Sequence, residues 1–217
     1  MSGAALDLWV FAYGSLMWRP GFPFIEVHPA RLTGWHRRFC IASRYHRGNH
    51  RRPGLVLGLD RGGVTDGMVY RVAAHDAVEV RRYLRAREQV SGIYREAHVN
   101  VALMDGTGGQ HQALVYLAER DHPGFTARFP VQRQAHIIAG ASGLSGSNVD
   151  YLLSTLIELK RLGIRERELE RVRTCLGAIR GGRGRPLTSH CCLESWPVDR
   201  SLKATDISRF IHRTRCG

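Results

Sequence analysis

The feature that most constrains the fold is a series of short segments rich in β-branched and aromatic residues, each ending at a glycine-rich break. Such segments are typical of strands. They occupy residues 8–13, 35–42, 55–59, 68–72, 98–104 and 113–117. The breaks Arg61-Gly62-Gly63 and Gly106-Thr107-Gly108-Gly109 are short enough for hairpins, which would make neighbouring strands partly antiparallel. We therefore expect a small mixed β-sheet or barrel of about six strands, and not a doubly wound sheet.

Helical patterns interrupt the strand segments once and then follow them. One helix is expected to begin at Asp76, with Glu79 three residues later in a capping-box-like start. A second helical region follows Pro130, and a third has Asn148 as its N-cap. The inward stripes of the third and fourth helices are Leu152, Leu153, Leu156 and Leu159, and Leu169, Val172, Leu176 and Ile179. The predicted class is α+β, with flanking helices.

The chain length and composition fit one domain. The 217 residues are 43% hydrophobic, which is ordinary for a globular protein. After Arg180 the sequence changes to a Gly/Arg-rich stretch, so residues 1–180 are interpreted as the domain and residues 181–217 as a basic linker and tail of unknown role.

The cysteines and the apolar stretches bear on location and on metals. The five cysteines show no C-x-x-C spacing, and His190 beside Cys191 and Cys192 does not provide four well-spaced ligands, so no metal is expected. No stretch approaches the roughly 20 apolar residues of a membrane span, and residues 1–7 are too acidic and short for a secretory signal. A cytoplasmic protein without a membrane partner is predicted.

The net charge of +13 favours anionic partners, either a nucleic acid or a small anionic substrate. The densest basic run spans residues 37–52. A solvated arginine-rich face explains such a run equally well. The sequence contains no recognisable nucleic-acid-reading motif, which argues against that partner.

Glu88 interrupts an apolar helical stripe. Ala77, Val80 and Leu84 form this stripe, and the next position on it is Glu88. An inward carboxylate must be paired, hydrogen-bonded or protonated with a raised pKa. A raised pKa suits a general base, whereas an ion pair with Arg87, Arg95 or the basic run would make Glu88 structural. Periodicity alone leaves both interpretations open.

A turn directly follows the first strand segment. In Tyr13-Gly14-Ser15-Leu16 the glycine and serine turn the chain and leave backbone N–H groups that can bind a carboxylate or an oxyanion. The sequence has no G-x-x-x-x-G-K-[ST], G-x-G-x-x-G or G-x-S-x-G pattern. Nucleotide cofactors and serine hydrolase chemistry therefore lack support, and no cofactor is expected.

These motifs, in this order, resemble the ChaC family of γ-glutamylcyclotransferases. The resemblance is carried by residues 10–18, Arg37-Arg38-Phe39, Ser43, His46-Arg47-Gly48, Tyr83-Leu84, Arg87-Glu88 and residues 148–152. It implies a small mixed barrel that cleaves glutathione to 5-oxoproline and cysteinylglycine, with residues 1–180 as the catalytic domain. One departure is Ile93, which stands where many relatives have a glycine pair before the tyrosine.

The resemblance also implies the roles of individual residues. Glu88 is the catalytic proton shuttle, and Tyr13, Gly14, Ser15 and Leu16 hold the γ-glutamyl end of the substrate, whose own α-amine is the nucleophile. Tyr151 faces the pocket. We expect one or more of Arg37, Arg38 and Arg47 to attract the anionic substrate. The alternatives are a cyclotransferase for other γ-glutamyl amines or amino acids, and a basic nucleic-acid-binding protein.

Overall fold

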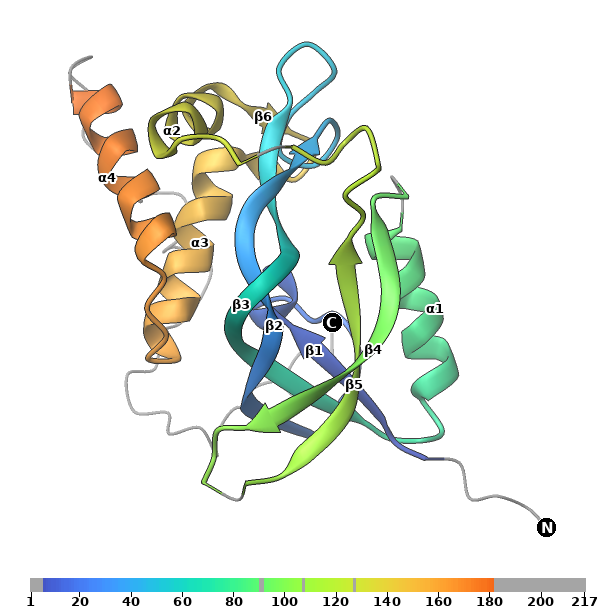
Figure 1. Ribbon diagram of the computed structural model, residues 1–217. Coiled ribbons are helices and arrows are strands. Elements are labelled where there is room, and N and C mark those ends of the chain that lie inside the picture. Colours follow the sequence, from blue (N-terminus) through green and yellow to red (C-terminus); the bar gives the residue numbers. More distant parts are fainter. Residues whose placement is uncertain (1–5, 90–91, 107, 127, 182–217) are drawn as a thin grey trace, which may run out of the picture.

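A closed five-stranded barrel forms the centre of the protein (Figure 1). The computed structural model describes residues 6–89, 92–106, 108–126 and 128–181. The barrel order is β1-β3-β2-β4-β5, with parallel pairing between β1 and β5 and antiparallel pairing elsewhere. The strands are β1 Leu8–Ala12, β2 Glu26–Ser43, β3 Gly54–Val72, β4 Tyr94–Leu103 and β5 Gln110–Ala118. The α+β class and the mixed barrel are confirmed.

The predicted break at Arg61-Gly62-Gly63 is wrong, because β3 runs through it. Gly62 and Gly63 have φ values of 92° and 75°, which glycine adopts without steric cost. They lie where the register with β2 shifts, between Thr33 and Trp35. The glycines thus accommodate a bulge inside one long strand, and the segments 55–59 and 68–72 are two parts of it. The second predicted hairpin is confirmed, since β4 and β5 pair around it.

In the described part of the chain, four α-helices flank the barrel. Helix α1 (Ala77–Glu88) lies on one side, while α2 (Val131–Gly140), α3 (Asn148–Arg161) and α4 (Arg167–Gly181) group on the other (Figure 1). A short 3-10 helix, η1 (Ser15–Met17), follows β1, and a two-stranded sheet of β6 (Ser142–Gly143) and β7 (Gly146–Ser147) precedes α3. None of the described helices is long and apolar enough to cross a membrane.

Two predicted helix caps differ from the structure. Asp76 is the N-cap of α1, but its side chain makes no capping hydrogen bond there, and Glu79 instead pairs with Arg82. Helix α3 is capped by Ser147, whose hydroxyl accepts from the Asp150 N–H at 3.0 Å. Asn148 is therefore not the cap, because its buried amide is engaged in a tertiary contact described below.

The core consists of two principal clusters. One joins barrel strands to the helices and includes Phe39, Leu152 and Leu176. The other lies among the strands and includes Leu59 and Val115. The predicted stripes of α3 and α4 all belong to the first cluster or pack against it, which confirms both helices. The predicted linker and tail from residue 182 onward, with the His190 and Cys191 group, lie outside the described residues.

Candidate active site

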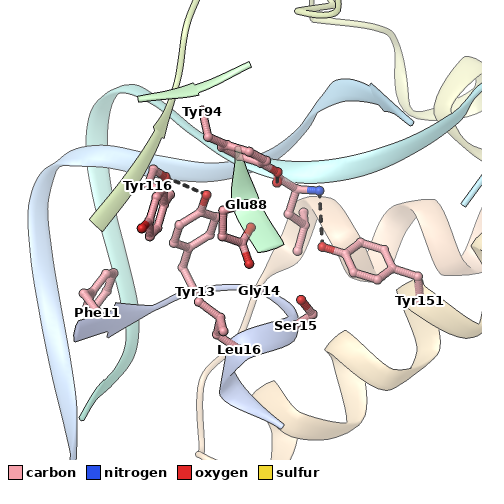
Figure 2. Close-up of a pocket in the computed structure, with 10 residues that line it drawn as sticks. Phe11, Tyr13, Gly14, Ser15, Leu16, Glu88, Tyr94, Tyr116 and Tyr151 are labelled. Atoms are coloured by element: carbon pink, nitrogen blue, oxygen red, sulfur yellow. Dashed lines mark hydrogen bonds between the residues drawn. The ribbon is translucent and has the colours of Figure 1, made fainter. Parts of the chain in front are cut away.

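A pocket opens beside the end of β1 (Figure 2). It is lined by Phe11, Tyr13, Gly14, Ser15, Leu16, Leu57, Glu88, Tyr94, Tyr116 and Tyr151. The fold thus brings six of the predicted site residues to one cavity, from the segment directly after β1 and from η1, α1 and α3.

Glu88 is the last residue of α1, and its carboxylate points toward Gly14 and Ser15 (Figure 2). Its side chain is only 17% exposed. Burial raises the pKa of Glu88, and the Arg87 guanidinium, with Nε 3.1 Å from Oε1, opposes that rise. Glu88 is therefore ion-paired and also has a raised pKa, so the two interpretations left open by the sequence both describe part of its environment.

The Tyr13-Gly14-Ser15-Leu16 turn is fixed from both sides. The Tyr13 hydroxyl donates to the Tyr116 carbonyl at 2.7 Å, and the Tyr13 carbonyl accepts from Arg37 Nε at 2.6 Å. Gly14 is the N-cap of η1. The first N–H groups of a helix have no acceptor within it, and Ser15 and Leu16, the first two residues of η1, both line the pocket.

The opposite wall is an edge of β3 that side chains cover. The Leu57 N–H donates to the Tyr151 hydroxyl at 3.4 Å, and the Leu57 carbonyl accepts from the Tyr94 hydroxyl at 2.8 Å. Two residues earlier, Asn148 binds both backbone groups of Leu55, at 2.6 and 2.7 Å. Side chains thus occupy the hydrogen-bonding groups that a neighbouring strand would otherwise take.

The pocket tyrosines remain protonated at neutral pH. Burial raises the pKa of Tyr151 to about 12 and that of Tyr94 well above its ordinary value. The charge of Glu88 adds to the rise at both residues. Neither phenol is suited to act as a base, which leaves Glu88, a carboxylate with a raised pKa, as the candidate base among the lining residues.

Four lining residues were not predicted from the sequence. They are Phe11, Leu57, Tyr94 and Tyr116. For Tyr116 a signal was present, because alternation along the strand segment 113–117 places Leu114 and Tyr116 on one face and Ala113, Val115 and Leu117 on the other. The sequence does not indicate which of the two faces meets the pocket.

The candidate arginines separate into different environments. Arg38 is not brought to the pocket, because Nη1 lies 2.7 Å from Asp60 in a buried pair. Arg37 is also buried and binds Glu166 as well as the Tyr13 carbonyl. Arg47 lies beside the pocket, with its guanidinium carbon 5.3 Å from the centroid of the ring of Tyr151, a lining residue.

The basic run is consequently not one continuous charged face. It combines the buried Arg37 and Arg38 with exposed residues such as Arg44, Arg51 and Arg52. No cluster of three or more potential metal ligands occurs among residues 6–181 wherever their structure is described. The pocket therefore offers a carboxylate with a raised pKa, backbone donors and neutral phenols, a set suited to proton transfer.

Comparison with known proteins agrees with this geometry. Residues 8–178 match the family model described as "ChaC-like protein". The chain is 36% identical over 159 residues to the glutathione-specific gamma-glutamylcyclotransferase of Escherichia coli (strain K12), covering 73% of this chain and 68% of that protein. It is also 36% identical over 148 residues to glutathione-specific gamma-glutamylcyclotransferase 1 of Homo sapiens, covering 67% of each.

A solved structure of a similarly named protein has a similar fold. The crystal structure of a gamma-glutamyl cyclotransferase specific to glutathione from yeast superimposes with a TM-score of 0.72 and 27% identity. The superposition covers 81% of this chain and 100% of that chain. Since the family match runs from β1 into α4 and includes every residue that lines the pocket, the chain belongs to the ChaC-like protein family.

Proposed function

We propose that this protein is a glutathione-specific γ-glutamylcyclotransferase, which converts glutathione to 5-oxoproline and cysteinylglycine. The observation that carries the proposal is the position of Glu88, a partly buried carboxylate with a raised pKa that faces the residue 13–16 turn in one pocket. The relatives that carry this activity in their names support it over most of the chain.

The reaction needs no nucleophile from the protein. The α-amine of the γ-glutamyl group attacks the γ-carbonyl carbon of the same group, a five-membered lactam closes, and the C–N bond to the cysteine breaks. Glu88 takes a proton from the attacking amine and delivers it to the departing nitrogen. Atoms balance without water, because the two products together contain the atoms of glutathione.

The remaining pocket residues orient the substrate. Ring closure within one molecule can reach very large effective molarities when the reacting atoms are held in contact. In this proposal the N–H groups of Ser15 and Leu16, which line the pocket, bind the α-carboxylate or the developing oxyanion. The neutral hydroxyl of Tyr151 keeps the opposite wall polar.

Arg47 is the best candidate for recognising the distal carboxylate of the tripeptide. Its guanidinium lies over the ring of Tyr151, which lines the pocket. Arg38 has no contact that supports a substrate-binding role, because its charge faces Asp60.

Residues 1–180 are proposed as the catalytic unit, acting in the cytoplasm. The family match ends at residue 178 and α4 ends at Gly181, which supports that boundary. Free thiols at Cys40 and Cys175 are compatible with a reducing compartment.

The test is an assay of the purified protein with glutathione and, separately, with γ-glutamyl dipeptides lacking the glycine. Release of 5-oxoproline and cysteinylglycine in equal amounts, with a clear preference for glutathione, is expected. Release of 5-oxoproline from dipeptides alone would assign a different γ-glutamyl substrate. No 5-oxoproline from any of them would refute the proposal.

A further inference from the structure

The guanidinium of Arg87 joins the end of α1 to the segment that follows β1. Its Nε lies 3.1 Å from Glu88 Oε1, and its Nη2 donates to Ser15 Oγ at 2.9 Å. Its Nη1 donates to the Arg19 carbonyl at 2.7 Å, and the Pro20 carbonyl and the Tyr83 hydroxyl lie within 3.2 Å. One side chain thus contacts the catalytic carboxylate and the substrate-binding turn together.

This arrangement differs from an ordinary ion pair on a helix surface. Neighbouring residues of an α-helix do not face each other, and stabilising pairs are normally three or four residues apart. Arg82 and Glu79 on the same helix form such a pair, and both are largely exposed. The Arg87 side chain, in contrast, is only 21% exposed and is anchored by acceptors outside the helix.

We infer that Arg87 is a positioning residue of the cyclotransfer reaction, which holds the Glu88 carboxylate and Ser15 in one fixed arrangement. The inference rests on the proposed function and deepens it. Arg87 does not need to touch the reacting atoms. Its planar fork has donors on several sides, so it can fix two partners at once, which a lysine ammonium on a flexible stem does less well.

The same contact keeps Glu88 available as a base. Burial favours the protonated carboxyl, and the neighbouring positive charge favours the carboxylate. Without Arg87 the pKa of Glu88 rises further, so a smaller fraction is ionised at neutral pH. The rate of an Arg87 variant should therefore fall most at low pH and recover as the pH increases.

The test compares Arg87→Met, Arg87→Lys and Arg82→Met by measuring kcat/KM for 5-oxoproline release from glutathione between pH 5 and 9. We expect Arg87→Met to lose about 100-fold at pH 7, and its acid limb to move up by about one pH unit. Arg87→Lys should keep the acid limb of the pH–rate profile near its wild-type position, because the positive charge remains. It should still be about tenfold slower than the wild type, because the planar guanidinium that binds two partners is lost. Arg82→Met, the control, should match the wild type.

The substrate has the same ionisation in every assay, so a difference between the pH–rate profiles of two variants reflects a group of the enzyme. Circular dichroism and thermal unfolding give the folded fraction at each pH. The inference would be overturned if the acid limb of the pH–rate profile of Arg87→Met coincides with that of the wild type and the rate falls no more than the folded fraction does. Arg87 would then have a merely structural role. If Arg87→Met does not fold, Arg87→Lys decides, because wild-type rates in that variant would equally overturn it. An inactive wild type would overturn the proposed function and this inference together.

Discussion

Substitution of Glu88 by glutamine removes the proposed proton shuttle and changes the volume of the side chain very little. General acid–base groups contribute about 10²- to 10⁴-fold to a rate. In the proposed mechanism the same carboxylate serves both proton transfers, so we expect kcat to fall by about 10⁴-fold, equivalent to about 5 kcal/mol in the barrier.

The stability of the Glu88→Gln variant should change much less. Removing one partner of a buried ion pair costs about 3–5 kcal/mol. However, the glutamine carbonyl still accepts from Arg87 Nε, and Arg87 retains acceptors such as the Arg19 carbonyl and Ser15 Oγ. Burial also disfavours the ionised carboxylate. The free energy of unfolding should therefore fall by only about 1 kcal/mol.

The pH dependence gives a second readout with a defined sign. Because the pKa of Glu88 is raised in the folded state, its contribution to stability is complete below the unfolded pKa and is lost as the pH rises through the folded pKa. Glu88→Gln lacks this decline. Its free energy of unfolding relative to the wild type should therefore increase as the pH rises from the unfolded to the folded pKa of Glu88.

The assay is the initial rate of 5-oxoproline release at matched folded fractions, with denaturant unfolding at several pH values. Glu79→Gln is the control, because Glu79 lies on the same helix and pairs with Arg82 at the surface. Turnover within tenfold of the wild type would refute the mechanism. A loss of about 3–5 kcal/mol with normal turnover per folded molecule would identify Glu88 as a structural ion-pair partner instead.

Three further results are expected. Arg47→Met should lower kcat/KM for glutathione by about 10- to 100-fold, because a charge-assisted contact with the carboxylate is lost. The kcat/KM for glutathione with a C-terminal carboxamide should not change. Equal losses on both substrates, or the same loss in the exposed-residue control Arg44→Met, would contradict this. Asp60→Asn should destabilise the fold by about 3–5 kcal/mol at pH 7, because it leaves Arg38 buried without its carboxylate. Burial opposes ionisation of Asp60, but its arginine partners lower its pKa overall, so this stabilisation is present above the unfolded pKa and is lost as the pH falls. Denaturant unfolding should therefore show a smaller difference in stability between the wild type and Asp60→Asn at pH 3 than at pH 7. An equal difference at both pH values would argue against the pair. A chain ending at Gly181 should keep the midpoint of thermal unfolding and the turnover of the full chain, and a loss of either would reject the proposed boundary.

The position of Glu88 could be predicted because it depends on local periodicity. The stripe of α1 continues to the last residue of the helix, and the structure places that residue at the pocket. The turn after β1 could be predicted for the same reason, since a glycine and a serine directly follow a strand pattern.

Features that depend on strand register could not be predicted. Leu57 and Tyr94 meet in one wall of the pocket because β3 continues beyond the end of β1 and Tyr94 reaches its free edge, and no local pattern encodes that arrangement. The cap of α3 is a similar case. Ser147 and Asn148 are both good N-cap residues, and the tertiary contact of Asn148 with Leu55 decides between them.

The covered edge of β3 has a consequence for the behaviour of the protein at high concentration. An open strand edge with free N–H and C=O groups is a template for pairing with another molecule. Among the described strands, β1 pairs with β3 only along Met68–Val72, so the Leu55 and Leu57 groups would form such a template. Asn148, Tyr94 and Tyr151 occupy those groups instead. Tyr94 and Tyr151, which line the pocket, therefore also help Asn148 to protect this strand edge from pairing with another molecule.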